Sequence, residues 1–225
     1  MQVVMTGLGA VIMAALCGLS AFFVIADKTR EHGAETAVVP PSAGRDISSQ
    51  AVDGLPLSLT EVFPDAEIRL AAGAAPYRIG MTHIDTDCYI AATGTLGALL
   101  EDHGCTQVVR AALTAPYGDY RVTAGLFNLP EAVDRIGDEV GAQVEAGDGS
   151  FAAMATGLPG TDAGAQPLAQ VAWRSRGHFL IYCVIARPDG QVVPDDDPDA
   201  QRITADLVES YLATTIIGKR AESLP

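Results

Sequence analysis

Charge is missing from the first 26 residues of the chain. No Asp, Glu, Lys, Arg or His occurs from Met1 to Ala26, so every charge lies further along the sequence. The apolar run from Val3 to Ile25 is about 23 residues long, and a helix of that length spans roughly 30 Å, the hydrocarbon thickness of a bilayer. We therefore expect residues 1–26 to form a transmembrane anchor that contacts the membrane through residues 3–25.

Three other interpretations of this segment fit the sequence less well. A cleaved signal peptide would carry basic residues before its apolar core, but no Lys or Arg precedes the core, and the run 22–25 extends it. A lipoprotein anchor at Cys17 would have a small residue before the cysteine, where this chain has Leu16. A soluble helix would need one domain to cover every side of an apolar rod. A retained anchor fits the pattern best.

The orientation of this anchor is signalled in two opposing ways. Lys28 and Arg30 follow the span and no basic residue precedes it, so the positive-inside rule alone would leave the domain in the cytoplasm. Two charges are a weak signal, however, and Asp27 and Glu31 stand beside them. The cysteines and the long polar segment after the span favour the extracytoplasmic side, and this is the placement that we expect.

Basic residues are scarce in the whole chain. Lys and Arg number 14 against 28 Asp and Glu, for a formal net charge of -14. A nucleic-acid backbone would be repelled by such a protein, so we expect no nucleic-acid partner.

Periodic apolar patterning is absent from residues 27–57, which are rich in Pro, Ser and Gly and are predicted to form a flexible linker. The globular domain is predicted at 58–217, followed by a short tail at 218–225. Helices are expected at 85–103, 130–144 and 198–217; strands are expected at 107–115, 119–128, 150–156, 168–174 and 178–187; a loop is expected at 157–165.

Two strand–strand–helix units, at 107–144 and 168–217, follow the leading helix of this predicted order. The second strand of the final unit, 179–186, is apolar on both faces and is expected to lie inside the sheet. Hairpins alternating with helices favour an α+β fold, here a two-layer sandwich of antiparallel sheet and helices in the order α-β-β-α-β-β-β-α.

Cysteine is also scarce, with Cys17 in the predicted span and Cys88, Cys105 and Cys183 in the domain. A straight helix between Cys88 and Cys105 would hold their Cα atoms about 25 Å apart, well beyond the roughly 7 Å limit for a disulfide. Either that helix breaks near Gly94 or Gly97, or Cys183 is a partner. At least one of the three remains a free thiol.

No recognisable motif for catalysis, for phosphate binding or for a metal is present. Cys88, His103 and Cys105 lack the paired spacing of a zinc site, and His83 and His178 have no visible nucleophile beside them. The acidic run 195–199 lacks the Gly and closing Glu of a calcium loop and suits the N-terminus of a helix. Trp173, Arg174 and Arg176 are candidates for a recognition patch, and 157–165 for a binding loop. We assign no catalytic, cofactor or metal residues and expect no cofactor.

The chain resembles uncharacterised actinobacterial single-pass membrane proteins with an extracytoplasmic α+β domain. The resemblance rests on the anchor, the linker, the preference for Arg over Lys, and the stretches 104–110 and 178–183; it implies no known activity. We expect a membrane-anchored binding or sensing module without catalysis that acts on an envelope protein or a small ligand. The alternatives are an envelope enzyme with a dispersed active site and a cytoplasmic-facing accessory subunit of a membrane complex.

Overall fold

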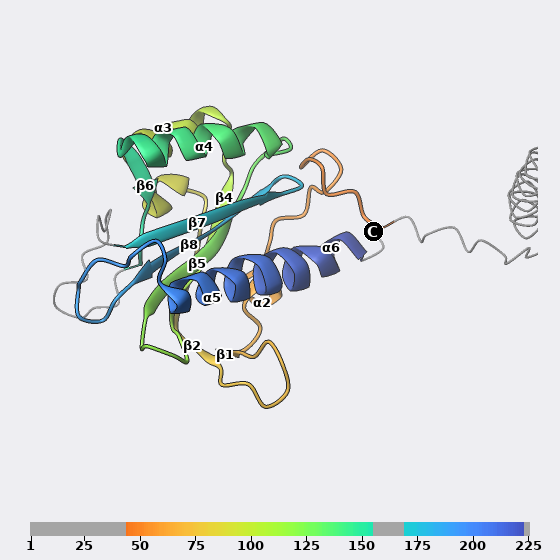
Figure 1. Cartoon of the computed structure of the whole chain (residues 1–225). Helices are drawn as coiled ribbons and strands as arrows, with labels where there is room; N and C mark the ends of the chain where they lie inside the picture. The colour runs from red at the N-terminus through yellow and green to blue at the C-terminus, as the bar shows by residue number, and fades with distance from the viewer. Residues whose placement is uncertain (1–43, 155–168, 223–225) are drawn as a thin grey trace, which may run out of the picture. The chain divides into compact units, whose positions relative to one another are not determined.

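The computed structural model describes residues 44–154 and 169–222. They belong to one compact unit, Gly44–Pro225 (Figure 1). Among these residues no helix has both the length and the apolar character needed to cross a membrane. The predicted anchor at 1–26, most of the linker and the loop at 157–165 lie outside the described residues.

The predicted α+β fold with an antiparallel sheet is confirmed. Six strands form one sheet in the order β1-β2-β4-β5-β8-β7, and every neighbouring pair is antiparallel. A separate two-stranded ribbon joins β3 to β6. The strands are β1 (Glu67–Ile68), β2 (Tyr77–Asp85), β3 (Ala92–Thr93), β4 (Gln107–Thr114), β5 (Arg121–Asn128), β6 (Gly149–Phe151), β7 (Gln170–Arg176) and β8 (Phe179–Ala186).

The domain has three layers, where the sequence predicted two. One face of the sheet is covered by the C-terminal helix and the short α2 (Leu59–Val62), and the other by α3 (Gly94–Asp102) and α4 (Asp134–Ala146), as Figure 1 shows. The physical reason is that β4, β5 and β8 are buried along almost their whole length. Strands that are apolar on both faces need cover on both sides.

The predicted helix at 85–103 is wrong in its first half. Strand β2 runs to Asp85, a 3₁₀ turn, η1 (Cys88–Ala91), follows, and α3 begins only at Gly94. Gly94 has a φ of +58°, and a Cβ there would lie 2.1 Å from the Asp148 carbonyl oxygen. This glycine therefore turns the chain against the β6 ribbon, and the turn brings Cys88 and Cys105 together.

The C-terminal helix consists of α5 (Pro198–Thr204), the π-helical η2 (Ala205–Ile217) and α6 (Gly218–Glu222). It begins as predicted, because Asp197 Oδ1 accepts hydrogen bonds from the Asp199 and Ala200 amides and Pro198 opens the first turn. Within η2 the hydroxyl of Ser210 donates to the carbonyl of Ala205, five residues earlier. The helix continues five residues past the predicted end at 217.

The folded unit is longer at both ends than predicted. Asp53 and Leu57 lie in the range expected to be linker, yet they are 0% and 2% exposed. At the other end Arg220, expected in a tail, is 6% exposed. The predicted linker at 27–57 therefore ends before residue 57, and the predicted tail at 218–225 begins later than residue 218.

Candidate functional site

A row of five residues crosses the sheet on the face covered by α3 and α4. The strand register places His83 of β2 opposite Arg110 of β4, Arg110 opposite Gly125 of β5, Gly125 opposite Tyr182 of β8, and Tyr182 opposite Trp173 of β7. Residues directly opposite on antiparallel strands have Cβ atoms about 5 Å apart. The row therefore aligns a histidine, an arginine and two aromatic side chains, and we call it the Arg110 row.

Gly125 allows the side chains of Arg110 and Tyr182 to approach each other above β5. A Cβ at this position would lie 2.7 Å from the Arg110 Cβ and 2.4 Å from the Val109 carbonyl oxygen. With no side chain between them, the Arg110 guanidinium lies close enough to the Tyr182 hydroxyl to affect its titration.

Arg110 is a buried cation with little compensation. The residue is 7% exposed, and its Nε and Nη1 atoms have no hydrogen-bond partner among the described residues. These two atoms carry three of the five N–H donors of an arginine, which stays protonated in proteins.

Tyr182 is enclosed by aromatic rings. Its ring stacks on Phe151 at a centroid distance of 4.9 Å and on Phe127 at 5.0 Å, and the residue is fully buried. Burial raises the pKa of the phenol to about 12, against the Arg110 guanidinium, which lowers it. The hydroxyl is therefore protonated at neutral pH and can donate a hydrogen bond.

The exposed end of the Arg110 row is formed by β2. The side chains of His83 and Asp85 are 42% and 38% exposed, and His83 Nε2 lies 3.9 Å from Asp85 Oδ2. The backbone N–H of Asp87 is the main cause that holds the pKa of Asp85 below its usual value, and the charges of His83 and Arg110 act in the same direction. In the described parts of the chain Arg110 has no ion pair within 4 Å.

Three parts of the described chain meet in a second polar cluster around Asp53. Arg220 of α6 donates from Nε to Asp53 Oδ2 at 2.6 Å and from Nη2 to Oδ1 at 2.8 Å. Its Nη1 also donates to Glu61 Oε1 at 2.6 Å, and Arg45 Nε lies 2.8 Å from Asp53 Oδ1. Burial raises the pKa of Asp53, but the hydrogen bonds from Arg220 and His178 outweigh it and leave that pKa below its ordinary value.

His178 is the third part of this cluster. Its Nδ1 lies 2.9 Å from the carbonyl oxygen of Leu129, its Nε2 lies 3.2 Å from Asp53 Oδ2, and the residue is fully buried. Both ring nitrogens thus face acceptors, which is an arrangement that fixes the ring and leaves no free nitrogen for base catalysis. The Asp53 cluster fastens residues 44–57 to the β7–β8 turn and to α6.

A third polar cluster joins the β4–β5 turn to the C-terminal helix. The hydroxyls of Tyr77 and Tyr117 both donate to Asp206 Oδ2, at 2.7 Å and 2.5 Å, and Arg202 lies over the Tyr117 ring. Burial is the main cause that raises the pKa of both phenols. Both phenol hydroxyls of this cluster have a partner within it, which makes it a structural contact.

A shallow hollow of about 180 Å³ lies at the end of the sheet where β4 begins and β5 ends. Its polar groups are satisfied by one another: Gln50 Nε2 donates to Thr106 Oγ1 and Asn128 Oδ1, and Gln107 exchanges hydrogen bonds with the backbone of Leu57. It offers a ligand no unpaired charge.

No protein-family model, curated protein or solved structure matches this chain.

The cysteines and histidines singled out in the sequence do not converge on a metal site. Cys88 and Cys105 form a disulfide with their Cα atoms 6.3 Å apart, and Cys183 is a buried free thiol. His103 Nε2 lies 3.0 Å from Glu139 Oε2, a contact that joins α3 to α4. Within residues 44–154 and 169–222, no group of three or more metal-ligating side chains occurs.

The acidic run serves as a helix cap, as predicted. Asp197 caps α5 and also accepts a hydrogen bond from the Tyr120 hydroxyl at 2.7 Å. Asp195 and Asp196 are exposed.

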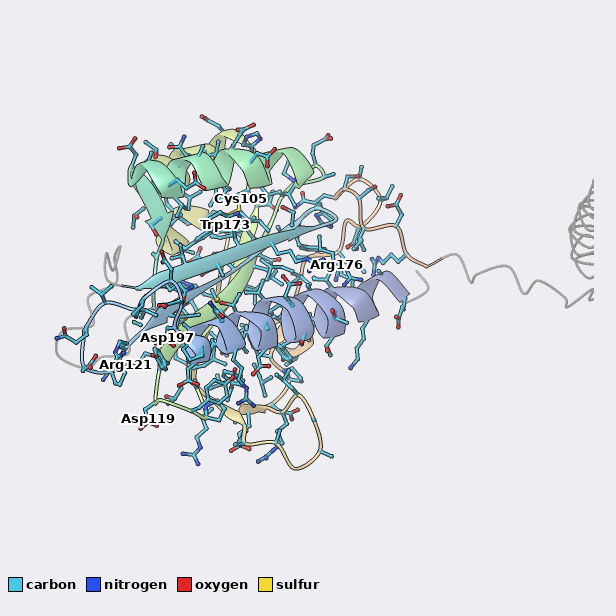
Figure 2. All side chains as sticks on the ribbon, in the orientation of Figure 1. Cys105, Asp119, Arg121, Trp173, Arg176 and Asp197 are labelled. Atoms are coloured by element: carbon cyan, nitrogen blue, oxygen red, sulfur yellow. A yellow bond between two sulfur atoms is a disulfide. The ribbon has the colours of Figure 1, made fainter. Side chains whose placement is uncertain are left out.

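The three residues proposed as a recognition patch point to opposite faces of β7. Trp173 lies 6.1 Å from the Phe151 ring on the α4 side, whereas Arg174 pairs with Glu209 and Arg176 donates to the Ala213 carbonyl on the side of η2 (Figure 2). They do not form one surface.

Sequence reasoning missed Arg110 and the Asp53 cluster. For Arg110 a signal was present, because it is the only charged residue in the apolar run 108–113. A lone arginine within a buried strand marks a cation that needs an anionic partner. Asp53 gave no comparable signal, since it stands in a stretch rich in Gly and Pro.

Proposed function

We propose that this chain is a binding or sensing module on the extracytoplasmic side of the membrane, held there by residues 1–26 and without catalytic activity of its own. The observation that carries the location is the Cys88–Cys105 disulfide, which is built into the fold next to α3. Disulfides persist in oxidising compartments and are rare in the reducing cytosol.

The binding role is supported by the Arg110 row. It combines a buried cation, a phenol that stays protonated and a rigid sheet covered on both faces. Residues held on strands keep their geometry better than residues on loops. The partner in this proposal is a small ligand or an envelope protein. The net charge of -14 argues against nucleic acid.

The Asp53 cluster supports a tethered arrangement. It attaches the segment that enters the domain to α6 and to the β7–β8 turn through buried ion pairs. A displacement of the domain relative to an anchor would therefore be transmitted through these ion pairs to the core of the domain. A structural change within the core would be transmitted to the tether in the same way, as a sensing role requires.

The location is tested by attaching a reporter thiol to the domain. Val192 is 56% exposed, so a Val192→Cys variant of the full chain presents an accessible thiol, while Cys183 is buried and Cys88 and Cys105 are paired. A membrane-impermeant maleimide is applied to intact and to lysed cells, with the chain lacking the substitution as the control.

Labelling of Val192→Cys on intact cells is the expected result, together with a faster-migrating band without reductant that reports the disulfide. Labelling that requires lysis, with Cys88 and Cys105 reduced, would place the domain in the cytoplasm and refute the proposal.

A further inference from the structure

We propose that the Arg110 guanidinium, with the Tyr182 hydroxyl beside it, binds a small oxyanion, a carboxylate or a phosphate. The inference names the class of ligand for the binding role proposed above and rests on that role.

Arg110 and Arg220 are the two deeply buried arginines among the described residues. Their exposed fractions are 7% and 6%. Arg220 donates to two carboxylates, Asp53 and Glu61, and to the carbonyl of Leu55. Arg110 has no hydrogen-bond acceptor for Nε or Nη1 within the part of the chain that the structure describes. The carboxylates thus compensate the buried charge of Arg220, whereas the buried charge of Arg110 is left for a partner of opposite charge.

The chemistry of the guanidinium selects the kind of partner. A guanidinium presents its N–H donors in one plane and binds carboxylates and phosphates more strongly than neutral acceptors. The Tyr182 hydroxyl adds one neutral donor, because its pKa of about 12 keeps the proton on the phenol. An oxyanion accepts from both groups at once, whereas a neutral carbonyl would leave the charge of Arg110 uncompensated.

The surroundings of Arg110 restrict the size of a ligand and the direction of its approach. The rings of Phe127 and Phe151 stack against Tyr182, and Gly125 places no side chain between Arg110 and Tyr182. The row reaches the surface at His83, which is 42% exposed and has a buried Nδ1 without a partner in the described residues. These surroundings favour an anion of a few atoms over a bulky one.

The acidic residue of strand β2 does not take the place of the ligand. Asp85 lies on β2 two residues from His83, and its Oδ1 accepts a hydrogen bond from the Asp87 amide. Its carboxylate is not within 4 Å of Arg110. The chain also carries Asp162, which lies outside the described residues and is therefore included among the test variants.

The test measures thermal unfolding of the full chain in maltoside micelles, which contain neither carboxylate nor phosphate. Trp173 is the single tryptophan and belongs to the Arg110 row, so its fluorescence reports the transition. Sodium acetate, sodium phosphate and sodium chloride are compared at equal ionic strength, and isothermal titration calorimetry measures the affinity of acetate and of phosphate.

We expect acetate, phosphate or both to raise the midpoint saturably over chloride, by about 3 to 6 °C at tenfold excess over the dissociation constant. An effect of acetate alone assigns a carboxylate ligand, and an effect of phosphate alone assigns a phosphate. The net charge of -14 disfavours loose accumulation of anions, so a saturable rise reports a site.

The Arg110→Met variant should lose this anion effect and should be at least as stable as the unsubstituted chain in chloride, because it removes an unpaired buried charge. Arg78→Met is the matched control: Arg78 is exposed on the neighbouring strand β2, and its variant should keep the full effect. Tyr182→Phe keeps the charge, and should weaken anion binding about fivefold through loss of one hydrogen bond.

Three results would overturn the proposal. The first is the absence of a saturable response to acetate or phosphate in the unsubstituted chain. The second is an unchanged response in Arg110→Met, with or without one in Tyr182→Phe. The third is a response that Asp162→Asn creates or strengthens, which would show that the chain supplies its own anion to Arg110. None of these bears on the labelling of Val192→Cys, so a failure of this inference is distinguishable from a failure of the proposed location.

Discussion

Arg220 and Asp53 stand 167 positions apart in the sequence and form a bidentate ion pair, with N···O distances of 2.6 Å and 2.8 Å. Asp53 is fully buried and Arg220 is 6% exposed. The pair closes the domain, because it joins the segment that precedes α2 to the last helix.

Replacement of Asp53 by Asn should destabilise the domain by about 3 to 5 kcal/mol, because it leaves the buried Arg220 with Glu61 as its remaining carboxylate. The free energy of unfolding from urea denaturation is the measurement. Asp189→Asn is the control, since Asp189 pairs with Arg187 at the surface and such pairs contribute under about 1 kcal/mol. Equal losses of unfolding free energy in the two variants would show that the Asp53 cluster stabilises the domain no more than a surface ion pair does.

The same cluster predicts how stability depends on pH. The pKa of Asp53 in the folded state lies below its value in the unfolded chain, about 3.9. Its contribution is therefore complete above about pH 5 and is lost as the pH falls through the folded-state pKa. Urea denaturation between pH 7 and pH 2.5 should show a smaller acid loss in Asp53→Asn than in the unsubstituted chain. Parallel curves for the two proteins would contradict this.

The start of the domain can be tested by truncation. A chain beginning at Gly44 retains the Asp53 cluster and the hydrogen bond from the His178 amide to the Ile47 carbonyl at 2.9 Å. A chain beginning at Ser58 loses both, along with the buried side chain of Leu57. We expect the first to show a cooperative thermal transition and the second to be unfolded or aggregated. Similar melting of the two would mean that residues 44–57 act as a linker after all.

Four of the six strands of the sheet were predictable from the sequence, whereas β1 and β2 were not. Strands β4, β5, β7 and β8 and the start of α5 carry local signals: apolar runs, turn glycines and the Asp197–Pro198 cap. These signals act over a few residues, and tertiary packing did not override them.

The parts that sequence reasoning missed depend on distant contacts. The break before α3 follows from the approach of Gly94 to Asp148, and the second helical layer follows from burial of β5 on both faces, although its alternating pattern was also compatible with an exposed face. The candidate site at Arg110 depends on its position beside Gly125 and Tyr182, which lie on other strands. No single stretch of the chain contains these relationships.

The disulfide should contribute about 3 kcal/mol, as expected for a bridge between residues 17 positions apart. Urea denaturation of the Cys88→Ser, Cys105→Ser double variant measures the loss. Cys183→Ala is the control, because it removes a buried thiol but closes no loop. Reductant should lower the stability of the unsubstituted chain to that of the double variant and should leave the double variant unchanged. An effect of reductant on both would point to a different cause.

Gly125 should be intolerant of a side chain. In Gly125→Ala the new Cβ would meet the Val109 carbonyl oxygen at 2.4 Å and the Arg110 Cα at 2.9 Å, and both are backbone atoms that cannot rotate away. We expect the free energy of unfolding to fall by at least about 2 kcal/mol, within the range for overpacking of a well-packed interior. The fluorescence of Trp173, at the far end of the Arg110 row, should change as well.

Gly141→Ala is the matched control. Gly141 lies within α4, its added Cβ would have an ordinary contact of 3.6 Å with Trp173, and alanine favours a helix by up to about 1 kcal/mol. This variant should be as stable as the unsubstituted chain or more so. If Gly125→Ala also keeps full stability, the close approach of β4 and β5 does not govern the position of Arg110, and the geometry argued for its oxyanion site loses its main support.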